Sequence, residues 1–296
     1  MAQRILRPLE YGDLFDELFD IYKHNFALLV GIAGIAYIPL NTIMMRWLFG
    51  SGLMKLPGIK PETTNHVPDA VLIQRLIFFF GGLAVVGVLG LLMYALVQAA
   101  MTWAISRRYL GEPATIIGSF RAVGKKALTL SLMILLALLI FYIGLILCIL
   151  PGLVIGVLFV FWFAFVVQVY VLEGMSMRNA LARSRALAAG NWLRIFVVYL
   201  LVAIIANVVQ RVIMLPFQLV IPGVGNPYLG ASSSAATAYG VVTGVAGALT
   251  APLSVLAFTL LYYDIRVRRE GFDIEMLARN MGESTPVTGP DTTIMQ

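Results

Sequence analysis

Six apolar runs, each long enough to cross a lipid bilayer, constrain this 296-residue chain more than any other feature of its sequence. An α-helix rises about 1.5 Å per residue, so about 20 apolar residues cross a hydrocarbon core of roughly 30 Å. The runs lie at about 26–49, 76–103, 128–150, 153–172, 192–215 and 239–263. Backbone polar groups in lipid must be satisfied within the segment, so each run is predicted to be a transmembrane helix. The predicted fold class is therefore an all-α polytopic membrane protein with six spans.

Composition supports this class. Hydrophobic residues make up 60% of the chain and charged residues only 12%, about half the roughly 25% that is usual in soluble domains. The net charge of +6 could suggest a nucleic-acid partner. In a membrane protein, however, the positions of the charges matter more than their sum, and we expect no nucleic-acid partner.

Three amphipathic segments separate the spans, and each of them precedes a pair of spans. They begin at Gly12, at Pro113 and at Ser176. Their apolar residues recur at helical spacing opposite charged residues, a pattern typical of helices at a membrane surface. We expect three inner-face helices that rest on the inner leaflet and turn Lys and Arg toward anionic headgroups, each basic residue contributing about 1 kcal/mol. The order of elements suggests a threefold pseudo-repeat of one elbow helix plus one helical hairpin.

Glycine, proline and serine mark the predicted ends of the elements. Pro151-Gly152 forces a short turn between the third and fourth runs, which predicts a helical hairpin. Ser176 is a predicted N-cap, Gly190 a predicted helix end, and Pro216 a predicted break after the fifth run. In the sixth run Gly240, Gly244 and Ala248 predict a face that a neighbouring helix can approach closely.

The membrane domain is predicted to cover residues 1–281 as one unit. From 282 to 296 the sequence is rich in Ser, Thr, Pro and Gly, which predicts a disordered tail. With both termini cytoplasmic, 16 of the 21 Lys and Arg lie on the inner side. That bias predicts an N-in, C-in topology, because basic residues near span ends resist translocation.

Charged residues at the inner ends of the spans form the first candidate site. Glu173 ends the fourth run and Asp264 ends the sixth. Carboxylates at the edge of a bilayer are expected to pair with arginine. We predict one polar cluster that locks the third elbow helix to spans four and six, with a gate or substrate site as the alternative reading; its residues are Glu173, Arg183, Arg185, Asp264, Arg266 and Arg268.

A second candidate lies in the fifth run, where Asn207, Gln210 and Arg211 share a helical face. Polar residues inside a span are functional candidates by default. This outer-side polar face could line a cavity or hold an anionic headgroup. Alternatively, Arg211 reaches the outer interface by extending its side chain along the helix.

The residues needed for cofactor, metal or nucleophilic chemistry are sparse. The histidines are His24 and His66, and the one cysteine is Cys148. None has partners at ligand spacing, and the sequence has no HExxH, GxSxG or Walker motif. We therefore expect no cofactor, no metal site and no enzymatic activity.

From Pro151 onward the chain resembles the bacterial membrane domain associated with glycerophosphodiester phosphodiesterases and its stand-alone relatives. The resemblance rests on the Pro151-Gly152-Leu153 turn, Leu172-Glu173-Gly174, Gly190-Asn191-Trp192 and Tyr263-Asp264-Ile265-Arg266. It implies a six-span helical domain in a bacterial inner membrane and supplies no active-site residues. We expect no soluble hydrolase domain from this sequence, so the resemblance implies no phosphodiesterase activity.

Together these features predict a non-enzymatic membrane scaffold or partner subunit that interacts with anionic lipid of the inner leaflet. A protein partner or a homo-oligomer remains open. The alternative is a transporter or channel for a lipid, an amphiphile or a small solute. Such a protein should show broken helices and polar groups near the bilayer midplane, of which Pro39 with Asn41 and Pro252 with Thr250 are a faint version.

Overall fold

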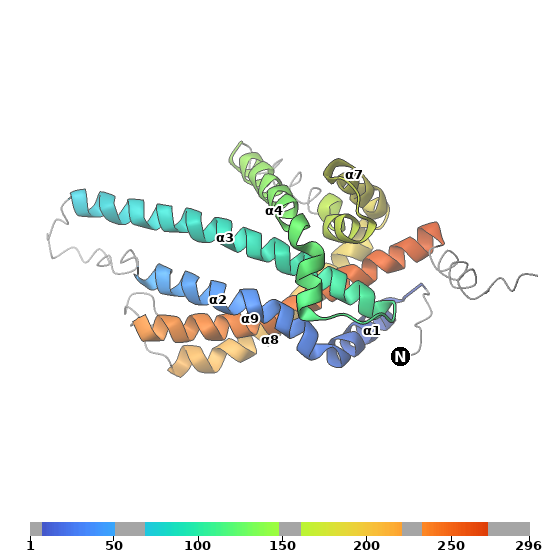
Figure 1. The fold of residues 1–296 in the computed structure, drawn as a ribbon, viewed down its shortest axis with the longest axis horizontal. Helices are drawn as coiled ribbons and strands as arrows, with labels where there is room; N and C mark the ends of the chain where they lie inside the picture. The colour runs from blue at the N-terminus through green and yellow to red at the C-terminus, as the bar shows by residue number, and fades with distance from the viewer. Residues whose placement is uncertain (1–7, 51–68, 148–160, 221–232, 272–296) are drawn as a thin grey trace, which may run out of the picture.

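A computed structural model of the protein describes residues 8–50, 69–147, 161–220 and 233–271. Every regular element in these ranges is a helix (Figure 1). In chain order the elements are α1 (Tyr11–His24), α2 (Phe26–Gly50), α3 (Asp69–Tyr109), α4 (Ile116–Leu147), α6 (Val166–Gln168), the π-helix η2 (Val169–Glu173), α7 (Met177–Ala188), α8 (Trp192–Val220) and α9 (Ser233–Glu270).

Four of these helices are long and apolar enough to cross a membrane. They span Phe26–Phe49, Leu76–Tyr109, Trp192–Val220 and Ser234–Glu270, and they correspond to the first, second, fifth and sixth predicted spans. The third predicted span begins within α4 and ends among residues outside the described ranges. The fourth begins there, and the Pro151-Gly152 turn and the 282–296 tail also lie outside the described residues.

The tightest contact between long helices joins α2 to α9. A Cβ atom added to Gly244 would lie 2.5 Å from the Cα of Ile38, and one added to Gly240 would lie 2.7 Å from the Cα of Thr42. Real Cβ atoms do not approach so closely, so glycine is required where the two backbones meet. The predicted small-residue face of the sixth run therefore does pack against a helix, and that helix is α2.

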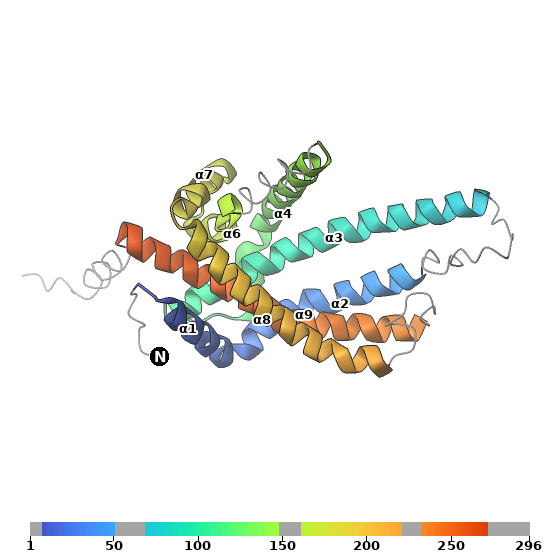
Figure 2. The ribbon, with the colours of Figure 1, turned by 180° about the vertical axis from the view of Figure 1, so that it is seen from behind.

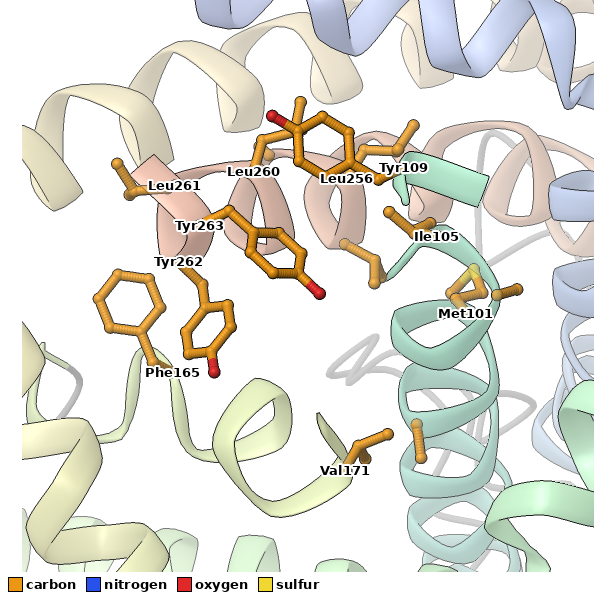
Figure 3. Packing of buried hydrophobic residues seen from close by; sticks show 14 of the residues in the cluster. Met101, Ile105, Tyr109, Phe165, Val171, Leu256, Leu260, Leu261, Tyr262 and Tyr263 are labelled. Carbon is orange, nitrogen blue, oxygen red and sulfur yellow. The ribbon is translucent and has the colours of Figure 1, made fainter. Parts of the chain in front are cut away.

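The core lies where the second half of α9 meets α3, α8 and the short helices before α7. Leu256, Leu260, Leu261 and Tyr262 of α9 are fully buried. Figure 3 shows Tyr262 beside Phe165 and Tyr263 turned toward the end of α3. Figure 2 shows α8 running across α9, with α7 and α1 beside the same end of α9. Elements from both halves of the chain thus surround one segment.

The amphipathic helices α1 and α7 form as predicted, but their apolar faces pack on protein rather than on the inner leaflet. Leu14 and Leu18 of α1 and Ala180 and Leu187 of α7 are buried. The side chain of Leu181 is partly buried against the same core. The sequence pattern shows that a face is apolar, but it cannot tell whether lipid or protein covers that face.

The second predicted amphipathic segment is not a separate helix. Helix α4 begins at Ile116 and runs without interruption into the third predicted span, although the ribbon changes direction along its length (Figure 1). The amphipathic pattern itself is present, since Val123 is buried while Arg121 and Lys125 are exposed. Gly124, which faces open space, does not break the helix.

Three predicted helix ends also differ from the structure. Helix α8 continues through Pro216 to Val220, because a proline inside an apolar helix removes one hydrogen bond without ending the helix. Helix α3 extends to Tyr109 and α9 to Glu270, beyond the apolar runs. Helix α7 has its N-cap at Ser176, and Gly190, with a φ of +78°, follows its C-cap, as predicted.

Candidate functional site

The final turns of α9, Tyr262–Glu270, carry most of the candidate site, and we call them the arginine-rich end of α9. One face of this segment carries residues at i, i+4 and i+8, namely Tyr262, Arg266 and Glu270. Nε of Arg266 lies 3.1 Å from Oε2 of Glu270. This face is directed toward α7 and the end of η2.

A first network joins this face to α7 and η2. Arg183 of α7 lies 3.2 Å from Glu173 of η2 and 2.6 Å from Glu270 of α9. The hydroxyl of Tyr262 donates a hydrogen bond of 2.6 Å to Oε1 of Glu173. Two arginines, counting Arg266, thus balance two carboxylates.

The two carboxylates beside Arg183 affect the pKa of its guanidinium group. Its hydrogen bond to Glu270, together with the nearby carboxylate of Glu173, raises the pKa of the Arg183 guanidinium above its ordinary value. Arg183 is therefore a permanent cation that bridges two acidic residues. In the partly buried setting of this network, a bridge of this kind holds three elements in one arrangement.

A second network lies on another face of α9 and holds the N-terminal segment. Oδ1 of Asp264 accepts hydrogen bonds from the backbone N–H of Leu9 at 2.8 Å and from Nε of Arg268 at 2.9 Å. Nη2 of Arg194, from α8, lies 2.9 Å from Oδ2 of Asp264. Arg194 and Arg268 both donate to the carbonyl of Leu9. The fully buried Asp264 side chain therefore joins α8, α9 and the start of the chain.

The six predicted inner-face residues thus do not form one cluster. Glu173, Arg183 and Arg266 belong to the first network, while Asp264 and Arg268 belong to the second. The separation follows from helix geometry, since positions 262 and 264 differ by about 200° around a helix axis. Arg185 joins neither network, and its guanidinium lies 4.3 Å from the ring centroid of Trp162.

The break between residues 163 and 166 is held by α7. Residues 164 and 165 form a turn, so the backbone N–H of Phe165 has no helical partner. Ser184 Oγ accepts that N–H at 3.1 Å and donates to the carbonyl of Trp162 at 2.7 Å. Lys126 of α4 donates to the carbonyls of Tyr170 and Val171 in the π-helix. Side chains from α4 and α7 thus satisfy polar backbone groups of this irregular segment.

Several basic side chains near these networks have no acidic partner among the described residues. Arg121 and Lys125 on α4 and Arg178 on α7 are exposed and form no ion pair within the described ranges. They differ from Arg183, Arg194 and Arg266, each of which meets a carboxylate.

The three residues of the predicted outer-side polar face have different surroundings in the structure. Asn207 and Arg211 are exposed, and the Asn207 amide donates to the carbonyl of Ala203 at 2.8 Å. Gln210 instead lines a pocket between α2, α8 and α9, whose other polar lining residues come from α2 and α9. Positions 207 and 211 lie one turn apart, while 210 points about 60° away from 207 around the axis.

Some residues of the candidate site do not stand out in the sequence. Tyr262 resembles its apolar neighbours, although its spacing of four residues from Arg266 is a usable signal. The sequence does not predict the roles of Ser184 and of the Leu9 backbone. Ser184 acts at a helix break about 20 residues earlier in the chain, and Leu9 contacts α8 and α9, which lie far from it in the sequence.

Few residues in the described ranges could support metal binding or catalysis by histidine or cysteine. No group of three or more His, Cys, Asp or Glu there has the geometry of a metal site. His24 lies 3.1 Å from its i−4 neighbour Asp20. His66 and Cys148 lie outside the described residues.

No family model, curated protein or solved structure matches this chain. The resemblance to the phosphodiesterase-associated membrane domain therefore stays a prediction.

Proposed function

We propose that this chain is a non-enzymatic membrane scaffold or partner subunit whose inner face binds anionic lipid. One observation carries the proposal: around the arginine-rich end of α9, some basic residues are paired with carboxylates and others are not. The arginines of the two networks are matched to carboxylates, while Arg121, Lys125 and Arg178 have no acidic partner among the described residues.

The two networks support a structural role. They connect the N-terminal segment, η2, α7 and α8 to one helix, α9. A buried ion pair that loses one partner leaves an uncompensated charge, which costs about 3–5 kcal/mol. Such networks favour one fixed arrangement of the elements they join, which is what a scaffold requires.

The unpaired basic residues support lipid binding. An exposed Lys or Arg near an anionic leaflet contributes about 1 kcal/mol of binding free energy. On this proposal α4 and α7 carry these residues at the surface of the inner leaflet. The N-in, C-in topology in a bacterial inner membrane, the six spans and the threefold repeat belong to the same proposal.

The exposure of α3 supports a protein partner. In the 18-residue window that defines α3 as a candidate span, no residue is buried within the chain, whereas half of the corresponding window of α9 is buried. Lipid or a second protein must therefore cover α3. A partner subunit or a second copy of the chain would pack on this helix.

Reconstitution into nanodiscs tests lipid binding. Discs made with phosphatidylglycerol and discs made only with phosphatidylcholine are compared by thermal unfolding and by native mass spectrometry of retained lipid. We expect phosphatidylglycerol to raise the melting temperature, and we expect high salt to weaken this effect. Replacing Arg121, Lys125 and Arg178 together by Gln should weaken phosphatidylglycerol binding by about a hundredfold, at about 1 kcal/mol per charge.

Arg46 and Arg211 provide the matched control, because both are exposed and lie on the parts of α2 and α8 far from the arginine-rich end of α9. The double variant Arg46→Gln, Arg211→Gln should retain the phosphatidylglycerol effect. Equal loss in the two sets would contradict a specific inner-face site.

A transporter or channel for a lipid, amphiphile or small solute is the second candidate. The observation that favours it is the pocket lined by Gln210, which lies between three long helices. A flux assay in proteoliposomes separates the two functions, since a scaffold moves no solute across the bilayer.

A further inference from the structure

A pocket of about 210 Å³ lies between α2, α8 and α9. Among the described residues, six polar side chains line it together with small residues: Tyr37 and Asn41 from α2, Gln210 from α8, and Thr243, Thr250 and Ser254 from α9. All three helices are among the candidate membrane spans. Polar side chains between membrane helices usually hydrogen-bond across the helices or face a cavity, and the lining residues here face a cavity.

The pocket lies well away from the arginine-rich end of α9. Thr250 precedes Asp264 by 14 residues, which is about 21 Å along the helix at about 1.5 Å per residue. On α2, Tyr37 is the twelfth of 25 residues. These positions place the pocket within the hydrocarbon core of a bilayer roughly 30 Å thick.

The hydrogen bonds of the lining residues leave specific groups free. Asn41 donates to the carbonyl of Tyr37, Thr243 to that of Tyr239, and Thr250 to that of Ala246. The hydroxyl donors of Thr243 and Thr250 and one N–H of Asn41 are thus engaged by their own helices, while the oxygen atoms of all three side chains can still accept hydrogen bonds.

The other three lining side chains, Tyr37, Gln210 and Ser254, form no side-chain hydrogen bond with any residue in the described ranges. They supply donors as well as acceptors. The pocket thus offers a mixed set of hydrogen-bonding groups. An uncharged hydroxyl group, which both donates and accepts hydrogen bonds, matches this set.

Charge and size narrow the class of ligand. No Lys, Arg, Asp or Glu among the described residues lines the pocket, and an ion without a counter-charge is costly to hold in low dielectric. At about 210 Å³, the pocket accommodates a small polar group rather than a whole lipid.

From these observations we infer that the pocket between α2, α8 and α9 binds an uncharged hydroxyl-bearing group, such as the glycerol head of a diacylglycerol or a free polyol. The inference does not depend on the proposed binding of anionic lipid at the inner face. The two sites use different residues, at different depths of the membrane.

Photocrosslinking in nanodiscs tests the inference. The probe is a diacylglycerol with a diazirine close to its glycerol group, and crosslinked peptides are mapped by mass spectrometry. We expect crosslinks on α2 around Asn41 and on α8 around Gln210. Unlabelled dioleoylglycerol should prevent them if the ligand is a lipid, and excess free glycerol should prevent them equally if it is a water-soluble polyol. If neither compound competes, the inference is overturned.

Gln210→Met keeps the length of the side chain and removes its hydrogen bonds. This variant should reduce crosslinking about fivefold, the effect of losing about one hydrogen bond. Ser254→Ala is a second variant with a smaller change of volume and the same expected direction. The matched control is Asn207→Leu, which removes an exposed amide one turn away on α8 and should leave crosslinking unchanged. Equal crosslinking in all three variants, with melting temperatures unchanged, would rule the site out.

Discussion

The hydroxyl of Tyr262 on α9 donates a 2.6 Å hydrogen bond to Glu173, the last residue of the π-helix η2. Glu173 also meets Arg183, which pairs with Glu270, about two turns beyond Tyr262 on the same face of α9. Through Glu173, the apolar core around Tyr262 is thus continuous with the charged surface at the end of α9.

Replacing Tyr262 by Phe should lower the free energy of unfolding by about 1.5–3 kcal/mol, because the lost hydrogen bond has an ionised acceptor. Tyr263→Phe is the matched variant, since its hydroxyl lies 2.6 Å from the neutral Ser106 Oγ. It should cost about 0.5–1.5 kcal/mol. Denaturation in mixed micelles measures both, and a larger loss for Tyr263→Phe would contradict the assignment.

Asp264→Asn should release the N-terminal segment. Arg194 and Arg268 would then lack their carboxylate, at a cost of about 3–5 kcal/mol for a broken buried pair. Compared with the wild type, the variant should be cleaved faster near Leu9, and this cleavage should occur while the rest of the chain is still folded. The control is Glu112→Gln at the half-exposed pair with Arg107, which should cost less than about 1 kcal/mol.

Gly244→Ala should force α2 and α9 apart, because the new Cβ would lie 2.5 Å from the Cα of Ile38. Overpacking of this kind costs about 1–3 kcal/mol. Gly87 on α3 faces open space, so Gly87→Ala should leave stability unchanged or raise it by up to about 1 kcal/mol. Melting temperatures in detergent compare the two, and equal shifts would argue against a glycine-dependent contact.

Ser184→Ala should destabilise the join between α7 and residues 162–165. The substitution removes the hydroxyl from both the Phe165 N–H and the Trp162 carbonyl, at about 1–3 kcal/mol for each group left unsatisfied. Hydrogen exchange at Phe165 should become faster. Ser176→Ala is the control, because the Ser176 side chain forms no capping hydrogen bond, and this variant should leave exchange at Phe165 unchanged.

Local sequence patterns predicted the helical class and the helix start at Ser176, because each depends on residues within one or two turns. The small-residue face of the sixth run was equally predictable from the sequence. Its partner, α2, was not, since no local signal specifies which of several apolar helices will meet that face.

Predictions that needed long-range geometry were less complete. One inner cluster was expected, and two networks are present, because Asp264 and Arg266 lie on different faces of α9. Pro216 was expected to end a helix that continues to Val220. Asn207, Gln210 and Arg211 were grouped on one helical face, yet of the three only Gln210 lines the pocket. Neighbouring residues on a helix point in different directions, and their surroundings decide their roles.

Helix α9 has 38 residues and is about 57 Å long at about 1.5 Å per residue, nearly twice the thickness of a hydrocarbon core of about 30 Å. The same continuous rod carries the glycine contact with α2, the polar pocket and both charged networks. Gly240 and Glu270 lie 30 residues apart on this helix, which is about 45 Å along its axis. A hydrocarbon core of about 30 Å around an upright α9 therefore cannot enclose both the glycine contact and the charged end of the helix.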